Sequence, residues 1–391
     1  MIEEMPEAPE FTLEEQELFR RDARRFVEAE VIPYVDEWER TERIPGSFWK
    51  RIGELGYLGL EFPEAYGGSE STFTAKRIFL EELSRCGAMA VALSVGVHTD
   101  MSSTYILDLG TEEQRQKYLP QLIQGEKICG IAITEPDAGS DIAGIRMQVR
   151  RRKDSYVLNG SKTFISNGVY GDVFVVAART QDVDQAHRTK GISLFIVERG
   201  IKGFSTSSKL EKLGWWASDT AELSFQDVEI PSQNLLGKEG EGFGHLVRNL
   251  QRERLIIAIV ACASAIRVQE RAIAYARDRH AFGQPLVQFQ ALRHRIADMV
   301  TLTEVASTFI RDLAGHFEAG RATDSLVSMG KLFATDVANQ VADTAVQVFG
   351  GYGCTREFRI ERFFRDARML KIAGGSSEIL REIIAKRLQL I

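Results

Sequence analysis

The stretch IAITEPDAGSD at 131–141 carries groups that suit the binding of a planar or anionic ligand. It leaves a β-like run, turns at Pro136 and Gly139, and offers the hydroxyls of Thr134 and Ser140. Such a turn also presents several backbone N–H groups, which can hydrogen-bond a heterocycle or a phosphate. An ordinary turn with no ligand explains this stretch equally well.

A second stretch of the same kind follows at 158–168, where LNGSKTFISNG presents a loop with Phe164 and Ser166. An aromatic ring and a hydroxyl beside glycines again suit contact with a flat ring system. Two such loops at the ends of β-like runs together favour a ligand site over two unrelated turns.

The segment NLQRERLIIAIVACASAI at 249–266 places a single carboxylate, Glu253, in an apolar stripe of a predicted helix. At helical spacing its face is shared with Asn249, Leu250, Ile256 and Ile257. Arg252 and Arg254 point about 100° away on either side. A charge there is costly unless an arginine from another helix pairs with it or it has a chemical task. A desolvated carboxylate is a competent general base.

Near the C-terminus, GGSSEI at 374–379 looks like a hinge that opens a helix. The chain is apolar on both sides of Gly374 and Gly375, and neither glycine can take up a proton. Any base in this region must therefore come from elsewhere in the chain.

Three blocks of different texture must position these residues. The first is helical, as in the segment 12–40, where the apolar pattern continues until Pro33 breaks it. In the second, short β-branched and aromatic runs alternate with Gly, Asn and Asp without intervening helices, which predicts an antiparallel barrel or sandwich. The third is helical again. We predict an α+β fold with an N-terminal helical domain at 1–128, a middle antiparallel β-domain at 129–235 and a C-terminal helical bundle at 236–391.

Composition excludes several classes of protein. The net charge is −6 and no apolar run approaches the length of a membrane span, so we expect neither nucleic acid nor a membrane as partner. No GxGxxG follows a strand, which excludes dinucleotide binding of the Rossmann type. The N-terminus is acidic and lacks a signal or transit pattern, which favours a cytoplasmic location, or the mitochondrial matrix in a eukaryote.

The cysteines show no metal-ligand spacing and do not cluster with the six histidines. We expect no metal site and four reduced, buried thiols at Cys86, Cys129, Cys262 and Cys354.

Five motifs in one order resemble the acyl-CoA dehydrogenase family, and together they cover essentially the whole chain. TEPDAGSD and NGSKTFISNG are similar to the paired flavin-contacting segments of that family. The other three are RDRHAFGQPLVQFQ at 277–290, QVFGGYG at 347–353 and GGSSEI at 374–379. The resemblance implies FAD as cofactor, an acyl-CoA thioester as substrate, an electron-transfer flavoprotein as partner and a homotetramer.

The resemblance also implies roles for individual residues. The isoalloxazine ring would be lined by Ile131, Ile133, Thr134, Phe164 and Ser166 and completed by Ser376 and Glu378. The pyrophosphate and adenine end would be held across a subunit boundary by Arg279, Phe282, Gln290, Gln347, Gly350 and Gly351. Ser140 would lie near both flavin and substrate. Plain core packing explains Ile131 and Ile133 as well as a ring contact does.

In the commonest branch of the family a glutamate occupies the position of Gly374. The isovaleryl- and long-chain branch instead carries its base on an internal helix, just before an Arg-Leu, and Glu253 stands there. The resemblance therefore implies that Glu253 removes the α proton while the flavin takes the β hydride. The N–H of Gly374 would donate to the thioester oxygen. Arg254 would contact the CoA portion, although an interhelical salt bridge would also explain it.

Three rival functions are compatible with the motifs. The nearest is a dehydrogenase of acyl-carrier-protein thioesters in a biosynthetic pathway, and the next is a flavin oxidase or monooxygenase, which would not need Glu253. The third, from another class, is a catalytically inactive flavin-binding scaffold, which Gly374 alone would favour and Glu253 opposes.

Overall fold

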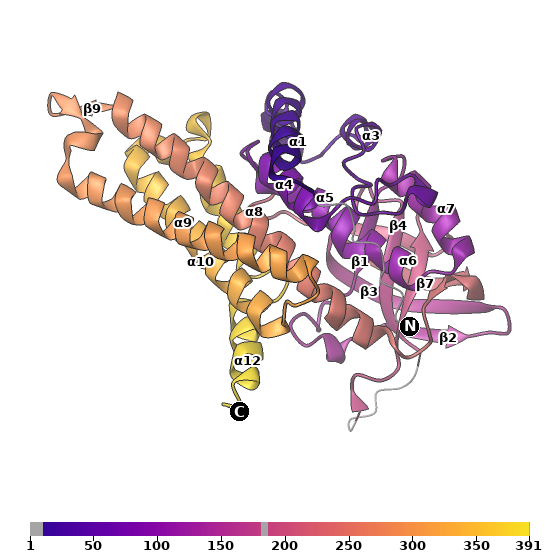
Figure 1. Cartoon of the computed structure of the whole chain (residues 1–391). Coiled ribbons are helices and arrows are strands. Elements are labelled where there is room, and N and C mark those ends of the chain that lie inside the picture. Colours follow the sequence, from indigo (N-terminus) through magenta and orange to yellow (C-terminus); the bar gives the residue numbers. More distant parts are fainter. Residues whose placement is uncertain (1–10, 181–186, 391) are drawn as a thin grey trace, which may run out of the picture.

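An N-terminal helical part, a β-part and a C-terminal helical bundle follow one another along the computed structural model (Figure 1). The structure describes residues 11–180 and 187–390, so most of the acidic N-terminus considered above lies outside the described residues. The predicted order of helices, strands and helices is confirmed. In Figure 1 the bundle extends to one side of the molecule and the sheet lies at the other.

The N-terminal part is a set of short helices. Its α-helices are α1 (Leu13–Phe26), α2 (Val35–Thr41), α3 (Gly46–Glu54), α4 (Phe73–Ser84), α5 (Met89–Gly96), α6 (Ser103–Leu109) and α7 (Glu112–Ile123). Capping boxes start two of them: Thr12 with Glu15 begins α1, and Thr111 with Gln114 begins α7. A π-helical turn after α1 ends at Val31, just before the Pro33 that breaks the helical pattern.

One sheet of eight strands forms the middle part. The strands are β1 (Cys129–Ala132), β2 (Gln148–Arg151), β3 (Ser155–Ser166), β4 (Val173–Arg179), β5 (Ile192–Glu198), β6 (Phe204–Lys209), β7 (Thr220–Pro231) and β8 (Leu235–Leu236). Their order is β6-β7-β3-β2-β4-β5-β8, with β1 beside β4. Most neighbours are antiparallel as expected, but β1 and β2 each run parallel to β4. Both parallel pairings require the chain to cross over before it reaches β4.

Strand β4 divides the β-part into two cores. Val173, Val175 and Ala177 face the core shared with α6 and α7, whereas the residues between them face the interior formed with β3, β5 and β7. Because successive side chains of a strand point to opposite faces, a run that is apolar at every position fits a strand buried on both sides. This central strand fixes the position of β1, which leads into the first motif.

Five helices form the C-terminal part. They are α8 (Gly242–Asp278), α9 (Gln290–Glu318), α10 (Asp324–Phe349), α11 (Ile360–Leu370) and α12 (Ser377–Arg387). A small hairpin of β9 (His280–Ala281) and β10 (Gln284–Pro285) joins α8 to α9 at the far end of the bundle (Figure 1). Residues 254–265 of α8 are buried, as their apolar run predicts.

Three of the four cysteines are buried as expected, but the prediction is wrong for Cys354, which is exposed. It ends the 3₁₀ turn after α10, at the bundle surface, where the glycine-rich chain supplies no side chains to cover it. Within the described ranges no helix is long and apolar enough to cross a membrane.

A buried histidine ties β1 to the N-terminal helices. Nδ1 of His98 accepts a hydrogen bond of 2.9 Å from the N–H of Cys129, and Nε2 lies 3.0 Å from the carbonyl oxygen of Leu122. The first contact requires an unprotonated Nδ1, so the ring is neutral with its proton on Nε2. Burial lowers the pKa of His98 to about 4.

We expect the free energy of unfolding to decrease as pH falls from about 6.5 toward 4, because the unfolded chain binds a proton that folded His98 does not. A shift of this size corresponds to about 3 kcal/mol over that interval. His98→Gln should flatten this part of the pH dependence in urea unfolding, whereas His316→Gln, at a partly exposed position, should leave it unchanged. An unaltered pH dependence in the His98 variant would contradict this assignment.

Candidate active site

The two motif loops meet at the ends of β1 and β3. The N–H of Thr163 donates to the carbonyl oxygen of Thr134 over 2.9 Å, and the Thr134 hydroxyl donates to the carbonyl oxygen of Thr163. Segments that are 29 residues apart in sequence therefore form one rim. The structure brings together the two stretches that the sequence singled out.

A buried ion pair anchors this rim. Nζ of Lys162 lies 2.7 Å from Oε1 of Glu135 and donates to the carbonyl oxygen of Ile133 at 2.8 Å. Glu135 also accepts from the N–H groups of Arg146 and Met147, at 2.6 and 2.9 Å, so both carboxylate oxygens are satisfied. Burial lowers the pKa of Lys162 to about 8, and the negative charge of Glu135 opposes that change. The loop after β1 is thus held in shape from beneath.

The aromatic ring of Phe164 stands out from this rim. Its side chain is 71% exposed, and its backbone has φ of 59°, in the left-handed region that non-glycine residues rarely adopt. An exposed ring on a strained backbone beside a satisfied polar loop is typical of a ligand contact. Ser166 is half-buried at the end of β3, and Ser140 is exposed on the first loop.

The isoleucines of the first motif divide between core and rim. Ile133 is buried in the core beneath the loop, whereas Ile131 is partly buried and packs against two cores. Core packing therefore accounts for Ile133, and Ile131 keeps a partly accessible surface.

Glu253 and Gly374 lie side by side although 121 residues separate them. A Cβ placed on Gly374 would lie 3.3 Å from Oε1 of Glu253 and 2.4 Å from Cδ1 of Ile257. Gly374 has φ of 64° and Gly375 has φ of 96°, so this turn requires glycine. The carboxylate that the sequence placed on an internal helix thus adjoins the position where a glutamate is missing.

The electrostatic environment of Glu253 is that of a desolvated carboxylate with distant cations. Burial raises the pKa of Glu253, and the positive charges of Arg254 and Lys331 offset part of that rise. In the part of the chain that the structure describes, Glu253 forms no ion pair within 4.0 Å. Burial also raises the pKa of Tyr105 on α6, and the charge of Glu253 adds to that effect.

The two arginines beside Glu253 have different surroundings. Arg252 turns away from it and binds Glu61 and Asp100, at 2.7 and 2.9 Å. Arg254 donates from Nε to the carbonyl oxygen of Gly374 at 3.4 Å, which is a backbone contact and not a salt bridge. Neither of these two arginines therefore forms a salt bridge with Glu253.

The remaining predicted residues lie in two other places. Ser376 caps α12 by accepting from the N–H of Ile379, and the Glu378 side chain is exposed on the first turn of that helix. The others gather at the far end of the bundle: Arg279, Phe282, Gln290, Gln347, Gly350 and Gly351. Phe282 is 96% exposed at the hairpin tip, with φ of 51°.

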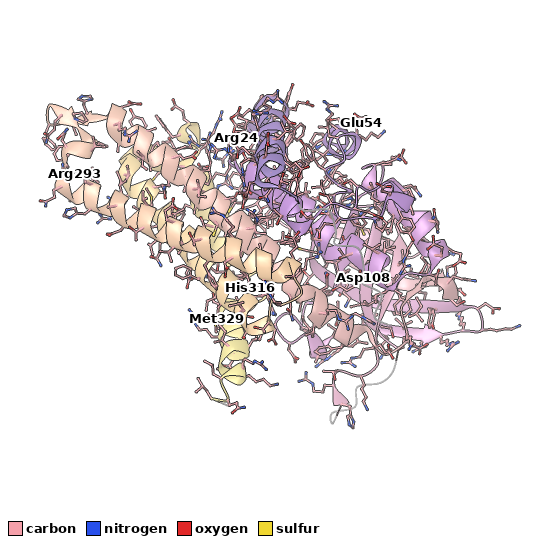
Figure 2. The ribbon with its side chains drawn as sticks, viewed as in Figure 1. Arg24, Glu54, Asp108, Arg293, His316 and Met329 are labelled. Carbon is pink, nitrogen blue, oxygen red and sulfur yellow. The ribbon has the colours of Figure 1, made fainter. Side chains whose placement is uncertain are left out.

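This far-end group does not meet the motif loops within one chain. Glu253 and Asp278 are separated along α8 by about 38 Å at 1.5 Å per residue. In Figure 2 Arg293, just after the hairpin, lies at the outer end of the bundle, whereas Asp108, one turn after Tyr105, lies in the other half of the molecule. A single chain therefore supplies two separate halves of the predicted cofactor site.

Sequence reasoning missed three residues of this site. Glu135 and Lys162 belong to the two motifs themselves, and their opposite charges within otherwise apolar β-runs are a signal that could have paired them. Lys331 lies on α10, and a lone lysine in an apolar helical pattern is the corresponding signal.

Together these features define a three-domain α+β protein with a desolvated carboxylate beside the Gly374–Gly375 turn and two strand-end loops joined to each other. Residues 13–126, 130–228 and 240–389 match the N-terminal, middle and C-terminal domains of acyl-CoA dehydrogenase.

Individual proteins give the same result. The chain is 41% identical to the short-chain specific acyl-CoA dehydrogenase of Clostridium acetobutylicum, over 96% of this chain and 98% of that protein. It is 37% identical to the mitochondrial long-chain specific acyl-CoA dehydrogenase of Rattus norvegicus, over 96% and 86%. The crystal structure of acyl-CoA dehydrogenase from Geobacillus kaustophilus superposes with a TM-score of 0.94 at 41% identity, covering 97% of this chain and all of that one.

The chain therefore belongs to the acyl-CoA dehydrogenase family, a family of flavoprotein oxidoreductases. The resemblance drawn from the five motifs is confirmed.

We expect Lys162→Met to destabilise the protein by about 3 to 5 kcal/mol, because it leaves the Glu135 carboxylate buried without its counter-ion. The double variant Glu135→Gln/Lys162→Met should recover part of that loss in urea unfolding. If the single and double variants are equally stable, the pair does not anchor the rim.

Proposed function

We propose that this protein removes hydrogen from Cα and Cβ of an acyl-CoA thioester to give the trans-2-enoyl product, with FAD as cofactor and an electron-transfer flavoprotein as acceptor. The observation that carries the proposal is the position of Glu253. Its carboxylate is desolvated, free of ion pairs among the described residues and adjacent to the Gly374–Gly375 turn. The confirmed family supports the chemistry.

Glu253 would act as the base for the α proton. A carboxylate whose pKa is raised by burial binds that proton more strongly than one in water. The charges of Arg254 and Lys331 favour the ionised form without bonding to it, which leaves the oxygens available. This combination suits abstraction of a weakly acidic proton.

The Gly374–Gly375 turn would receive the thioester oxygen. Within the described residues the N–H groups of both glycines have no hydrogen-bond acceptor. A free backbone donor beside the base is well placed to stabilise negative charge that develops on the oxygen when the α proton leaves. We assign Arg254 to the CoA portion of the substrate and Ser140 to the place where flavin and substrate meet.

The residues present fit FAD. The exposed Phe164 ring and the polar groups of Thr134 and Ser166 suit the ring system, and Ile131, Ser376 and Glu378 would complete the contacts with it. When bound, FAD supplies the acceptor for the β hydride. The chain's own part is to hold the thioester between this rim and Glu253 and to exclude water.

The far-end group fits the remainder of the cofactor in a second copy of the chain. Arg279, Gln290 and Gln347 provide hydrogen-bond donors, and Phe282 provides an exposed ring at the hairpin tip. Side chains placed on Gly350 or Gly351 would meet nothing within 4 Å, so the backbone there is open to a ligand. Because both halves are incomplete within one chain, we propose a homo-oligomer, and a tetramer as the family implies.

We expect Glu253→Gln to retain FAD and to slow the bleaching of the flavin by acyl-CoA by at least 10³-fold, because an amide cannot accept the proton. Anaerobic titration with acyl-CoAs of varied length and branching, compared with carrier-bound thioesters, gives both the rate and the preferred substrate. Glu382→Gln, at an exposed position on α12, is the control. A fully active Glu253→Gln enzyme would overturn the assignment of the base.

We expect Gly374→Glu, added to Glu253→Gln, to restore part of the activity from the opposite side of the site. The new Cβ would lie 2.4 Å from Cδ1 of Ile257, and φ of 64° strains any side chain there. Adding Ile257→Val should relieve the clash and raise the recovered rate in the same bleaching assay. Equal rates with and without Ile257→Val would show that the clash is not what limits recovery.

We expect Arg279→Gln to lower the FAD content of the purified oligomer. The subunits that keep FAD should still be bleached by acyl-CoA, because Glu253 is unchanged. Mixing this variant with Glu253→Gln subunits under exchange conditions should produce some sites that draw both intact halves from different chains. Activity above that of either variant alone, measured as bleaching per mole of FAD, checks the arrangement. No recovery after demonstrated subunit exchange would argue that each site is built from one chain.

A further inference from the structure

A lysine with no exposed surface lies behind the proposed base. Lys331 is on α10, two residues after the Met329 labelled in Figure 2, and its side chain is 0% exposed. Its Nζ donates to the carbonyl oxygen of Gly375 over 2.8 Å. A buried ammonium group is costly unless its donors form hydrogen bonds, and the bond to Gly375 offsets part of that cost.

The charges around Lys331 come from three helices. Glu253 and Arg254 face it from α8, Asp336 from α10 itself and Glu378 from α12. Asp336 is already paired with Lys371 at 2.5 Å, and Lys331 forms no ion pair within 4.0 Å with any residue that the structure describes. Burial lowers the pKa of Lys331 to about 7, and among its neighbours Glu253 opposes that shift most strongly. The ammonium group is thus bonded to the turn and electrostatically coupled to the base.

Two cations from two helices hold consecutive carbonyl groups of the glycine turn. Arg254 of α8 donates to Gly374 and Lys331 of α10 donates to Gly375, at 3.4 and 2.8 Å. Glycine imposes no preference for these left-handed conformations and loses more entropy than other residues when it is fixed. Contacts outside the turn must therefore keep it against Glu253.

We propose that Lys331 is a positioning residue of this active site. It holds the Gly374–Gly375 turn beside Glu253 through its bond to the Gly375 carbonyl, and it supplies a positive charge that favours the ionised form of Glu253. This inference rests on the proposed function, because it gives Glu253 the part of the base. Lys331 acts through the turn and through Glu253 and does not touch the substrate.

The hydrogen bond and the charge can be separated by substitution. Lys331→Met keeps the volume and removes both, Lys331→Gln keeps a donor without the charge, and Lys331→Arg keeps the charge and the donors. The control is Lys371→Met, which removes a lysine at the C-terminal end of α11 and leaves the Gly375 contact intact. All four are compared as FAD-loaded oligomers.

We expect Lys331→Met to lower kcat about tenfold or more with a smaller change in KM, because the turn acts on the reacting atoms and not on the CoA arm. The acidic limb of the pH profile of kcat should move about one unit toward higher pH, since loss of a nearby positive charge raises the pKa of Glu253 further. The charged groups that remain around Glu253 are Arg254 on α8 and, when ionised, Tyr105 on α6. Lys331→Arg should restore the limb, and Lys371→Met should leave it unchanged.

Hydrogen exchange of the peptide that spans 371–380 gives a readout independent of catalysis. Lys331→Met should speed exchange in this peptide several-fold, while Lys331→Gln should remain closer to the parent protein. Unchanged exchange in Lys331→Met would overturn the proposal that Lys331 holds the glycine turn. An unchanged acidic limb in Lys331→Gln would overturn the role of the charge. If Lys331→Met does not fold, Lys331→Leu, which also removes both the donor and the charge, takes its place in the exchange measurement, and Lys331→Gln still tests the charge.

The proposal and the proposed function fail in different ways. If no acyl thioester bleaches the flavin of the parent protein, the proposed function is wrong. Hydrogen exchange at 371–380 still tests whether Lys331 holds the glycine turn. If the parent protein is active and Lys331→Met has the same kcat, pH profile and exchange, only the role of Lys331 is wrong.

Discussion

The site depends on one carboxylate that is kept desolvated without being neutralised. Glu253 is half-buried on an apolar helix face, Arg252 is paired with Glu61 and Asp100, and Arg254 is occupied by a backbone carbonyl. A bonded counter-ion would lower the proton affinity of this carboxylate, and full exposure would do the same. The ion pairs and backbone contacts of its neighbours therefore matter as much as its own burial.

The rim formed by the two motif loops depends on a different buried charge. Lys162 and Glu135 join the strand-end loops from beneath and use almost all their polar atoms in doing so, so the loop backbone is fixed before any ligand binds. Such a fixed rim can carry the strained, exposed Phe164 because the surrounding contacts determine its conformation. The rim and the glycine turn share one arrangement. In each, a buried charge holds the backbone beside a functional group, Phe164 or Glu253, and Glu253 forms no ion pair among the described residues.

Sequence patterns were sufficient for the order of domains and the motif loops, whereas the nearness of Glu253 to the glycine turn followed only from the resemblance to the family. They could not give the parallel pairing of β1 and β2 with β4, because strand direction depends on long-range crossings and not on local alternation. They also missed Lys331 and the Glu135–Lys162 pair, since a single charge in an apolar run does not say which distant atom it meets. Exposure of Cys354 was missed for a related reason: its glycine-rich turn lies at a surface that only the packed bundle defines.

The proposed base lies at a point that two elements of this fold can reach. Position 253 on α8 and position 374 before α12 adjoin the same small space, so a carboxylate from either can enter it. In this chain Ile257 fills the volume that a side chain on residue 374 would need, and the backbone at Gly374 and Gly375 has taken a conformation that favours glycine. Moving a carboxylate between the two positions therefore also involves position 257, with the turn held in place by cations from α8 and α10. Loss of Glu253 alone leaves the site without a carboxylate, and a side chain on residue 374 alone meets Ile257, so the three residues are best understood as a single unit.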